Sequence, residues 1–258
     1  MKGELMAAEM AEQPAVLAAL AGRRAEVVEH VRACLPEPLA GVVLVARGSS
    51  DYAAVYGRYL LELAARRPVA LAAPSLQTRY DARTELPGWV AVAVSQSGRT
   101  PEIVATLERL VAGGARGVAI TNDQASPLAA AAGATIALEA ALKLRETTGI
   151  LAEGWSTADY LHGPIAASGE AVPALAVHAD GPVRADVVDL ASRLRERGSL
   201  VLELADDAGA DLPVTGGLPE ALCAFPLAVR AQQLAHAVAL QRGLDPDAPP
   251  GLAKITRT

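Results

Sequence analysis

Short apolar runs alternate with longer stretches of helical spacing along the first half of the chain. The runs fall at residues 41–46, 69–73, 89–94, 117–121 and 134–138. Apolar residues recur at every third or fourth position between these runs, at residues 6–35, 52–66, 100–112 and 127–132, which is typical of amphipathic helices. Continuous apolar runs are typical of strands buried on both faces, and such helices connect parallel strands. The pattern therefore predicts an α/β fold with a doubly wound parallel sheet flanked by helices, an αβα sandwich.

The second half of the chain contains fewer strand signals. A helix is predicted at residues 139–147, followed by strands at 174–178 and 200–204 with a helix at 184–197 between them. A short strand is predicted near Val214, and a long helix at 220–242. The tail from Asp245 to Thr258 contains Pro246, Pro249 and Pro250, which exclude regular structure there.

Composition narrows the classes of partner. The chain of 258 residues is 52% hydrophobic and 3% aromatic, so its core is aliphatic. Its net charge of -6, without a run of Lys or Arg, argues against nucleic acid as a partner. The pattern shows neither a signal peptide nor a membrane span. Cys34 and Cys223 follow no metal-ligand spacing and lie among apolar residues, so we expect buried thiols, no metal site and a cytoplasmic protein.

Two strand-to-helix turns in the first half are rich in hydroxyl groups. The first contains Ser49 and Ser50, and the second contains Ser95, Ser97 and Thr100. Such hydroxyls commonly cap the helix that follows them. However, both turns lie at the carboxyl ends of strands, where open α/β sheets bind ligands, and the free N–H groups of a helix start favour an anion. Two such turns on one sheet favour a phosphate site over simple capping.

Five segments of the chain, in order, resemble the SIS (sugar isomerase) domain family, and in particular the isomerase half of glucosamine-6-phosphate synthase. The opening Glu12-Gln13-Pro14 is also similar to the segment that precedes the first SIS domain there. The five segments are Arg47-Gly48-Ser49-Ser50, Ser95-Gln96-Ser97-Gly98-Arg99-Thr100, the segment from Leu138 to Glu146, Leu161-His162-Gly163-Pro164 and Leu252-Ala253-Lys254. The resemblance covers nearly the whole chain.

The resemblance implies roles for individual residues. The family's phosphate loop matches the second turn, and the family serine that contacts the sugar matches Ser50, next to Ser49. The residues that would hold the phosphate are Ser95, Gln96, Ser97 and Thr100.

Four further residues match catalytic positions of the family. The resemblance implies that Glu146 moves a proton between C1 and C2, that His162 is donated by the neighbouring subunit for ring opening, and that Lys254 engages the carbonyl. Lys143 matches another active-site lysine. Without the resemblance, Lys143 and Glu146 would be interpreted as a helical surface pair at spacing three.

The chain departs from the family pattern in two places. No glutaminase domain precedes the SIS region, so ammonia would have to be used free or be released. The fifth predicted strand also runs directly into the helix that normally follows the first strand of the second SIS domain. We therefore predict a SIS-like domain with an N-terminal helix at 1–138, and a second, truncated SIS-like half at 139–258 that lacks its first strand and carries the active-site tail. If the absence of the first strand of the second SIS domain is a deletion, the remaining strands of that domain must pair with the first sheet or with another subunit.

Two functions are compatible with these observations. One is a phosphosugar isomerase or amino-sugar-phosphate deaminase that acts on a hexose 6-phosphate or glucosamine 6-phosphate, needs no cofactor, and is a homodimer with shared active sites. The alternative is a non-catalytic regulatory protein that binds a sugar phosphate. A dinucleotide-dependent oxidoreductase is disfavoured, because the first turn lacks the Gly-x-Gly-x-x-Gly pattern and no acidic residue ends the second strand.

Overall fold

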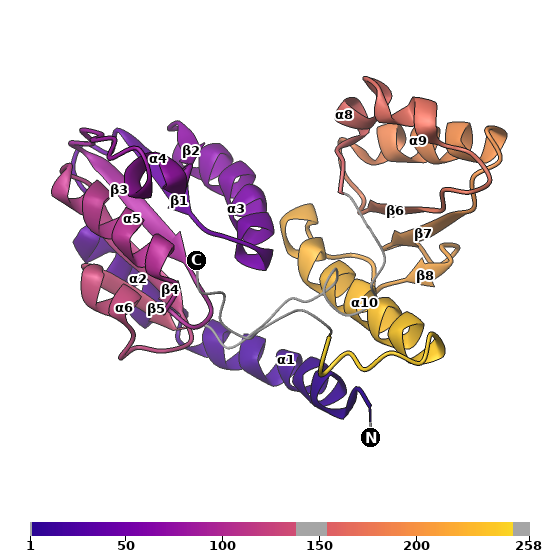
Figure 1. Cartoon of the computed structure of the whole chain (residues 1–258), viewed down its shortest axis with the longest axis horizontal. Coiled ribbons are helices and arrows are strands. Elements are labelled where there is room, and N and C mark those ends of the chain that lie inside the picture. The colour runs from indigo at the N-terminus through magenta and orange to yellow at the C-terminus, as the bar shows by residue number, and fades with distance from the viewer. Residues whose placement is uncertain (1, 138–153, 250–258) are drawn as a thin grey trace. The chain divides into compact units, whose positions relative to one another are not determined.

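The computed structural model describes residues 2–137 and 154–249 (Figure 1). The chain divides into two compact units, one made of residues 11–142 and 250–258 and the other of residues 1–10 and 143–249. We call them the first unit and the second unit. The domain boundary expected at residues 138 and 139, together with the predicted helix at 139–147, lies outside the described residues and stays a prediction.

The first unit contains a parallel sheet of five described strands. They are β1 (Gly41–Val45), β2 (Val69–Leu71), β3 (Trp89–Val94), β4 (Arg116–Thr121) and β5 (Ala134–Ala137), in the order β2-β1-β3-β4-β5. Its helices are α2 (Arg24–Cys34), α3 (Ser49–Ala65), α4 (Pro74–Thr78), α5 (Pro101–Ala112) and α6 (Pro127–Ala131). The predicted parallel α/β fold is confirmed.

Each face of this sheet has its own aliphatic core. On β1, Val43 and Val45 belong to the core formed with α5 and α6, whereas Val42 and Leu44 belong to the core beneath α3. This alternation follows from the two-residue period of a strand. All five residues of β1 are buried, as expected for a central strand of a parallel sheet.

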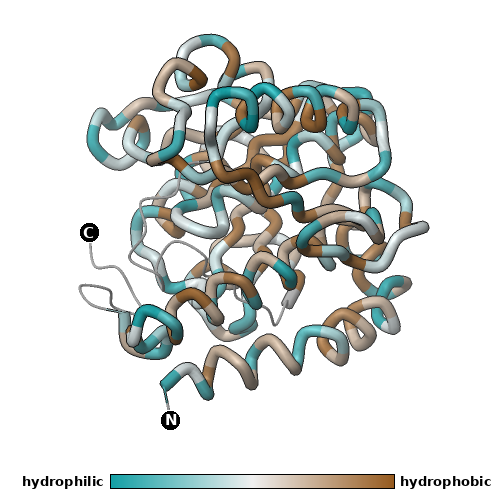
Figure 2. Tube along the Cα trace, turned by 90° about the vertical axis from the view of Figure 1, so that its right-hand side faces the viewer, coloured by the Kyte–Doolittle hydropathy of each residue, from teal (hydrophilic) through white to brown (hydrophobic). Residues whose placement is uncertain are grey.

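Hydrophilic and hydrophobic residues alternate along the coiled segments in Figure 2, and α5 shows how such a helix packs on the sheet. In α5, Ile103, Leu107 and Leu110 recur at three- and four-residue spacing and are all buried against the sheet. Pro101 occupies the first position of α5, where its missing N–H costs nothing. Because the sheet fixes the other side of this core, the start of α5 is held at the end of β3.

The predictions for the helices need two corrections. The single helix expected at residues 6–35 is wrong, because α1 (Glu4–Gly22) and α2 are separate helices. Gly22, a poor helix former, ends α1, which explains the break. The five-residue helix α4 begins at Pro74 and was not predicted.

The second unit has its own parallel sheet, with the described strands β6 (Ala174–His178), β7 (Val201–Ala205) and β8 (Leu212–Pro213) in that order. Helix α9 (Arg184–Glu196) packs on one face, and α10 (Glu220–Gln241) packs on Leu204 of the other. The short α8 (Thr157–Leu161) and a 3-10 turn (Pro164–Ala167) precede β6. These described strands pair with one another in a separate sheet, so the expected pairing with the first sheet is wrong for the described residues. Pairing with another subunit stays a prediction.

Across the described ranges, none of the helices has both the length and the apolar character that crossing a membrane would require.

Candidate functional site

The two hydroxyl-rich turns lie side by side at the carboxyl edge of the first sheet. One follows β1 and the other follows β3, and these two strands are hydrogen-bonded neighbours. The chain leaves β1 toward β2 on one side and leaves β3 toward β4 on the other. A reversal of this kind opens a crevice beyond the strand ends, where doubly wound sheets bind their ligands. We therefore place the candidate site at the β1/β3 crevice.

Main-chain hydrogen bonds fix the turn after β3 against the neighbouring strand. The N–H of Ser95 donates to the carbonyl of Ile120 at 3.0 Å, and the carbonyl of Gln96 accepts from the N–H of Asn122 at 2.9 Å. The hydroxyl of Thr121 also donates to the Gln96 carbonyl, at 3.2 Å. With its backbone held in this way, the turn presents its side chains at a defined place on the sheet edge.

Gly98 is the one position of this turn that requires glycine. Its φ is +61°, a left-handed conformation that L-residues adopt at a cost. A Cβ atom built on it would lie 2.2 Å from Oγ of Ser126 and 2.7 Å from Oγ1 of Thr121. Its carbonyl accepts from the N–H of Leu128 at 3.1 Å, so the start of α6 packs directly on the turn.

The hydroxyls of the two turns do not cap the helices that follow. Thr100 is the N-cap residue of α5, yet α5 has no side-chain capping bond, and neither does α3, whose N-cap is Gly48. By contrast, Ser126 caps α6 by accepting from the N–H of Ala129. The capping interpretation therefore does not account for the hydroxyls at α3 and α5, since neither helix has a capping bond from the side chain of its N-cap residue.

The hydroxyl groups themselves lie at different depths. Ser95 is buried and its Oγ lies 3.4 Å from Oγ1 of Thr100, whereas Gln96 is exposed. Ser97 accepts from the N–H of Arg99 at 3.3 Å. In the first turn, Ser49 is exposed and Ser50 is half-buried, both in the first turn of α3. All six predicted phosphate- and sugar-binding residues thus lie at the one sheet edge.

An ion pair links the two turns. Nε and Nη2 of Arg47, just after β1, donate to the two carboxylate oxygens of Glu102 in the first turn of α5, at 2.9 and 3.1 Å. The hydrogen bond from Arg47 holds the pKa of the Glu102 carboxyl below its ordinary value, and the same hydrogen bond raises the pKa of Arg47. Both groups are therefore charged at neutral pH.

A second ion pair lies on the other side of the turn. Nη2 of Arg99 donates to Oδ2 of Asp123 at 2.7 Å, and the pKa of Asp123 is lowered by this bond. Sequence reasoning missed both pairs, because their members are 55 and 24 positions apart and meet only through strand pairing.

Of the four predicted catalytic residues, His162 alone lies within the described residues. Lys143, Glu146 and Lys254 lie outside the described residues. His162 lies in the second unit, exposed, where α8 ends, and its N–H donates to the carbonyl of Asp159 at 3.2 Å. Their predicted roles remain predictions.

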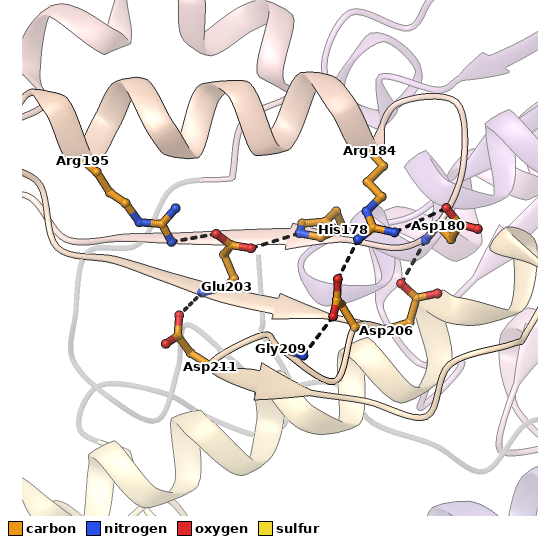
Figure 3. A network of polar contacts seen from close by, with 9 residues as sticks. His178, Asp180, Arg184, Arg195, Glu203, Asp206, Gly209 and Asp211 are labelled. Carbon is orange, nitrogen blue, oxygen red and sulfur yellow. Dashed lines mark hydrogen bonds and ion pairs between the residues drawn. The ribbon is translucent and has the colours of Figure 1, made fainter.

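The second unit has a polar network at the carboxyl end of its sheet, which sequence reasoning missed (Figure 3). Arg184, at the start of α9, donates to Asp207 at 2.7 Å, and Asp206 accepts from the N–H of Asp180 at 3.0 Å. The signal in the sequence is a set of acidic residues directly after two predicted strands. Since these contacts tie the loops after β6 and β7 to each other, they stabilise the sheet edge.

The three histidines other than His162 lie within helices or strands. The side chain of His178 is 3% exposed at the end of β6, with Nε2 at 3.5 Å from Oε2 of Glu203 (Figure 3). Nε2 of His236 in α10 lies 2.9 Å from the carbonyl oxygen of Gly3. His30 lies within α2. In the described ranges, no group of His, Cys, Asp and Glu side chains has an arrangement suited to a metal ion.

Comparisons with known proteins agree with the fold of the first unit. The SIS domain family matches residues 41–136, which span the first sheet from the start of β1 to the last residue but one of β5. A glutamine–fructose-6-phosphate aminotransferase (isomerizing) from Sphingobium yanoikuyae is 35% identical over 127 residues, which is 46% of this chain and 81% of that protein. The Zymomonas mobilis protein of the same name is 26% identical over 353 residues, which covers 96% of this chain and 58% of the relative.

Solved structures share the fold over nearly the whole chain. A candidate phosphosugar isomerase from Silicibacter pomeroyi is 26% identical with a TM-score of 0.84, and the match covers 96% of this chain and 100% of that one. A glucosamine-6-phosphate deaminase from Thermotoga maritima, 20% identical, shares the fold with a TM-score of 0.72 over 93% of this chain and 99% of that one. From the motifs, the sheet order and these matches together, we conclude that the chain belongs to the SIS domain family.

Proposed function

We propose that the chain binds a hexose 6-phosphate with its phosphate group at the turn formed by residues 95–100. The observation that supports this best is the start of α5, which lies at the β1/β3 crevice without a side-chain capping bond. The N–H of Glu102 and the hydroxyls of Ser97 and Thr100 can donate to a phosphate, and the helix dipole favours an anion there. Gly98 lets this turn pack against the start of α6, because a Cβ atom there would meet Ser126.

We also propose that the chain is a phosphosugar isomerase or an amino-sugar-phosphate deaminase. The names of its relatives support this class, and the residues that match their family supply the chemistry. Glu146 would transfer a proton between C1 and C2 of the opened sugar, and Lys254 would stabilise charge on the carbonyl oxygen, with Lys143 nearby. His162, from a neighbouring subunit, would assist ring opening, which makes the active form a homodimer.

The experiment that tests this reaction follows the hydrogen that moves between C1 and C2, which is bound to C1 in fructose 6-phosphate and to C2 in glucosamine 6-phosphate. Fructose 6-phosphate and glucosamine 6-phosphate are incubated with the protein in deuterium oxide, and deuterium incorporation is followed by proton NMR. We expect Glu146→Gln, which keeps the shape but removes the base, to slow exchange by about 10² to 10⁴ while sugar-phosphate binding stays. Glu108→Gln, the same change on an exposed position of α5, is the matched control and should exchange at the wild-type rate. Exchange at the wild-type rate by Glu146→Gln would rule out this base.

A regulatory, non-catalytic role is the second candidate. The alignment with the Zymomonas mobilis relative runs over 353 positions, more than the 258 residues of this chain, so that relative contains positions with no counterpart here. A chain that binds the sugar phosphate tightly but never exchanges the C1 hydrogen of fructose 6-phosphate or the C2 hydrogen of glucosamine 6-phosphate would favour this role.

A further inference from the structure

The ion pair between Arg47 and Glu102 is the feature of the candidate site that its proposed function does not explain. Glu102 places a negative charge in the first turn of α5, next to the position proposed for the phosphate. A carboxylate is favoured at a helix N-terminus when the terminus is empty, but it repels a phosphate that binds there. Arg47 compensates this charge through two hydrogen bonds.

The geometry connects this pair to both turns. Arg47 directly precedes Gly48 and the hydroxyls of the first turn, and Glu102 is two residues after Thr100 of the second. The side chain of Glu102 is 20% exposed and that of Arg47 is 45% exposed, so the carboxylate is held in place while the guanidinium still borders solvent.

We propose that Arg47 and Glu102 set the affinity of the site for a phosphate dianion, with Arg47 as the attracting charge and Glu102 as the charge that limits it. This inference rests on the proposed phosphate site at residues 95–100. It makes Arg47 a determinant of specificity for phosphorylated over unphosphorylated sugars. It also predicts opposite effects for the two partners of one ion pair, which a purely structural contact does not.

The test measures binding of fructose 6-phosphate, inorganic phosphate and fructose to the full chain by calorimetry at about 0.1 M salt. We expect Arg47→Met to weaken the binding of fructose 6-phosphate and phosphate by about tenfold, because it removes a positive charge beside a dianion. We expect Glu102→Gln to tighten both by about fivefold, because it removes a negative charge there. The double variant should return to within about twofold of wild type, since it restores the charge balance. All of these differences should shrink at 0.5 M salt.

The chain offers a matched control on the same helix. Arg109 in the last turn of α5 forms an ion pair with Asp81, and its side chain is 43% exposed, close to the 45% of Arg47. It lies seven residues from Glu102, which corresponds to about 10 Å along a helix, or one Debye length. Arg109→Met removes the same charge and should leave phosphate affinity unchanged. Thermal unfolding without ligand separates stability from binding, because Glu102→Gln should not raise the melting temperature while it tightens phosphate.

Two results would overturn the inference in distinguishable ways. If Arg47→Met and Glu102→Gln weaken phosphate binding equally, the pair is only a structural link between the turns, and the proposed phosphate site stands. If wild type binds phosphate and fructose 6-phosphate no better than fructose, or if replacing Ser97 and Thr100 by Ala leaves binding unchanged, the proposed site itself fails, and the inference fails with it.

Discussion

Gly98→Ala is expected to destabilise the first unit more than a glycine substitution of the same conformational class elsewhere. Placing alanine at φ +61° costs about 1 to 2 kcal/mol from the left-handed backbone alone. The new Cβ would also lie 2.2 Å from Oγ of Ser126, a buried hydroxyl that caps α6. Displacing that cap costs about 1 kcal/mol more, and leaving its hydroxyl unpaired adds a similar amount. We therefore expect a total loss of about 3 to 4 kcal/mol.

Gly114→Ala is the matched control within the same unit. Gly114 also has a positive φ, of +99°, but its nearest contact for a Cβ atom would be 3.5 Å, an ordinary van der Waals distance. The Gly114→Ala substitution should therefore lower the free energy of unfolding only through the left-handed backbone conformation, by about 1 to 2 kcal/mol. Urea unfolding followed by circular dichroism gives both free energies, and fructose 6-phosphate binding shows whether the turn keeps its shape. Equal destabilisation by the two variants would refute the close packing of Gly98 against α6.

Two further predictions concern the ion pair and the subunits. The pKa of Glu102 is lowered in the folded chain by its hydrogen bond from Arg47, so the pair stabilises the fold above the ordinary pKa of 4.5 and this contribution is lost as the pH falls through the folded value. The unfolding free energies of wild type and Glu102→Gln should thus differ by less than about 1 kcal/mol at pH 7. The two values should converge as the pH falls below the ordinary pKa of Glu102. A difference that grows at low pH would contradict this. For the shared site, mixing inactive His162→Ala with inactive Glu146→Gln after unfolding and refolding should restore part of the activity, and a fully active monomer in light scattering would exclude sharing.

Most of the first sheet could be predicted from the sequence because its strands are continuous apolar runs. The strand β3 begins and ends where the run of valines and alanines at 89–94 does, and the order of the elements along the chain was sufficient for the parallel class. The long first helix was predicted without its break because a single glycine, Gly22, carries only a weak signal. The helices α4 and α8 are five residues each, too short to show a period.

In the candidate site, too, features formed by one segment of sequence could be predicted, and contacts between distant segments could not. The hydroxyls of residues 95–100 could be predicted because the whole turn is one segment of sequence. Whether Thr100 caps its helix could not be predicted from the sequence, since that depends on where its side chain points. The Arg47–Glu102 pair depends on β1 and β3 being neighbours in the sheet although β2 lies between them in sequence. The network around Asp206 likewise depends on β6 and β7 being neighbours in their sheet.

The binding position of the phosphate is the central claim, and backbone amide NMR tests it most directly. Fructose 6-phosphate is titrated into labelled protein, with fructose at the same concentrations as the control. We predict saturable shifts of the amides of residues 97–100 and 102, which need the phosphate group and are lost when Ser97 and Thr100 are both replaced by Ala. Saturable shifts that leave these amides unchanged, or that fructose reproduces, would contradict the phosphate site at the start of α5.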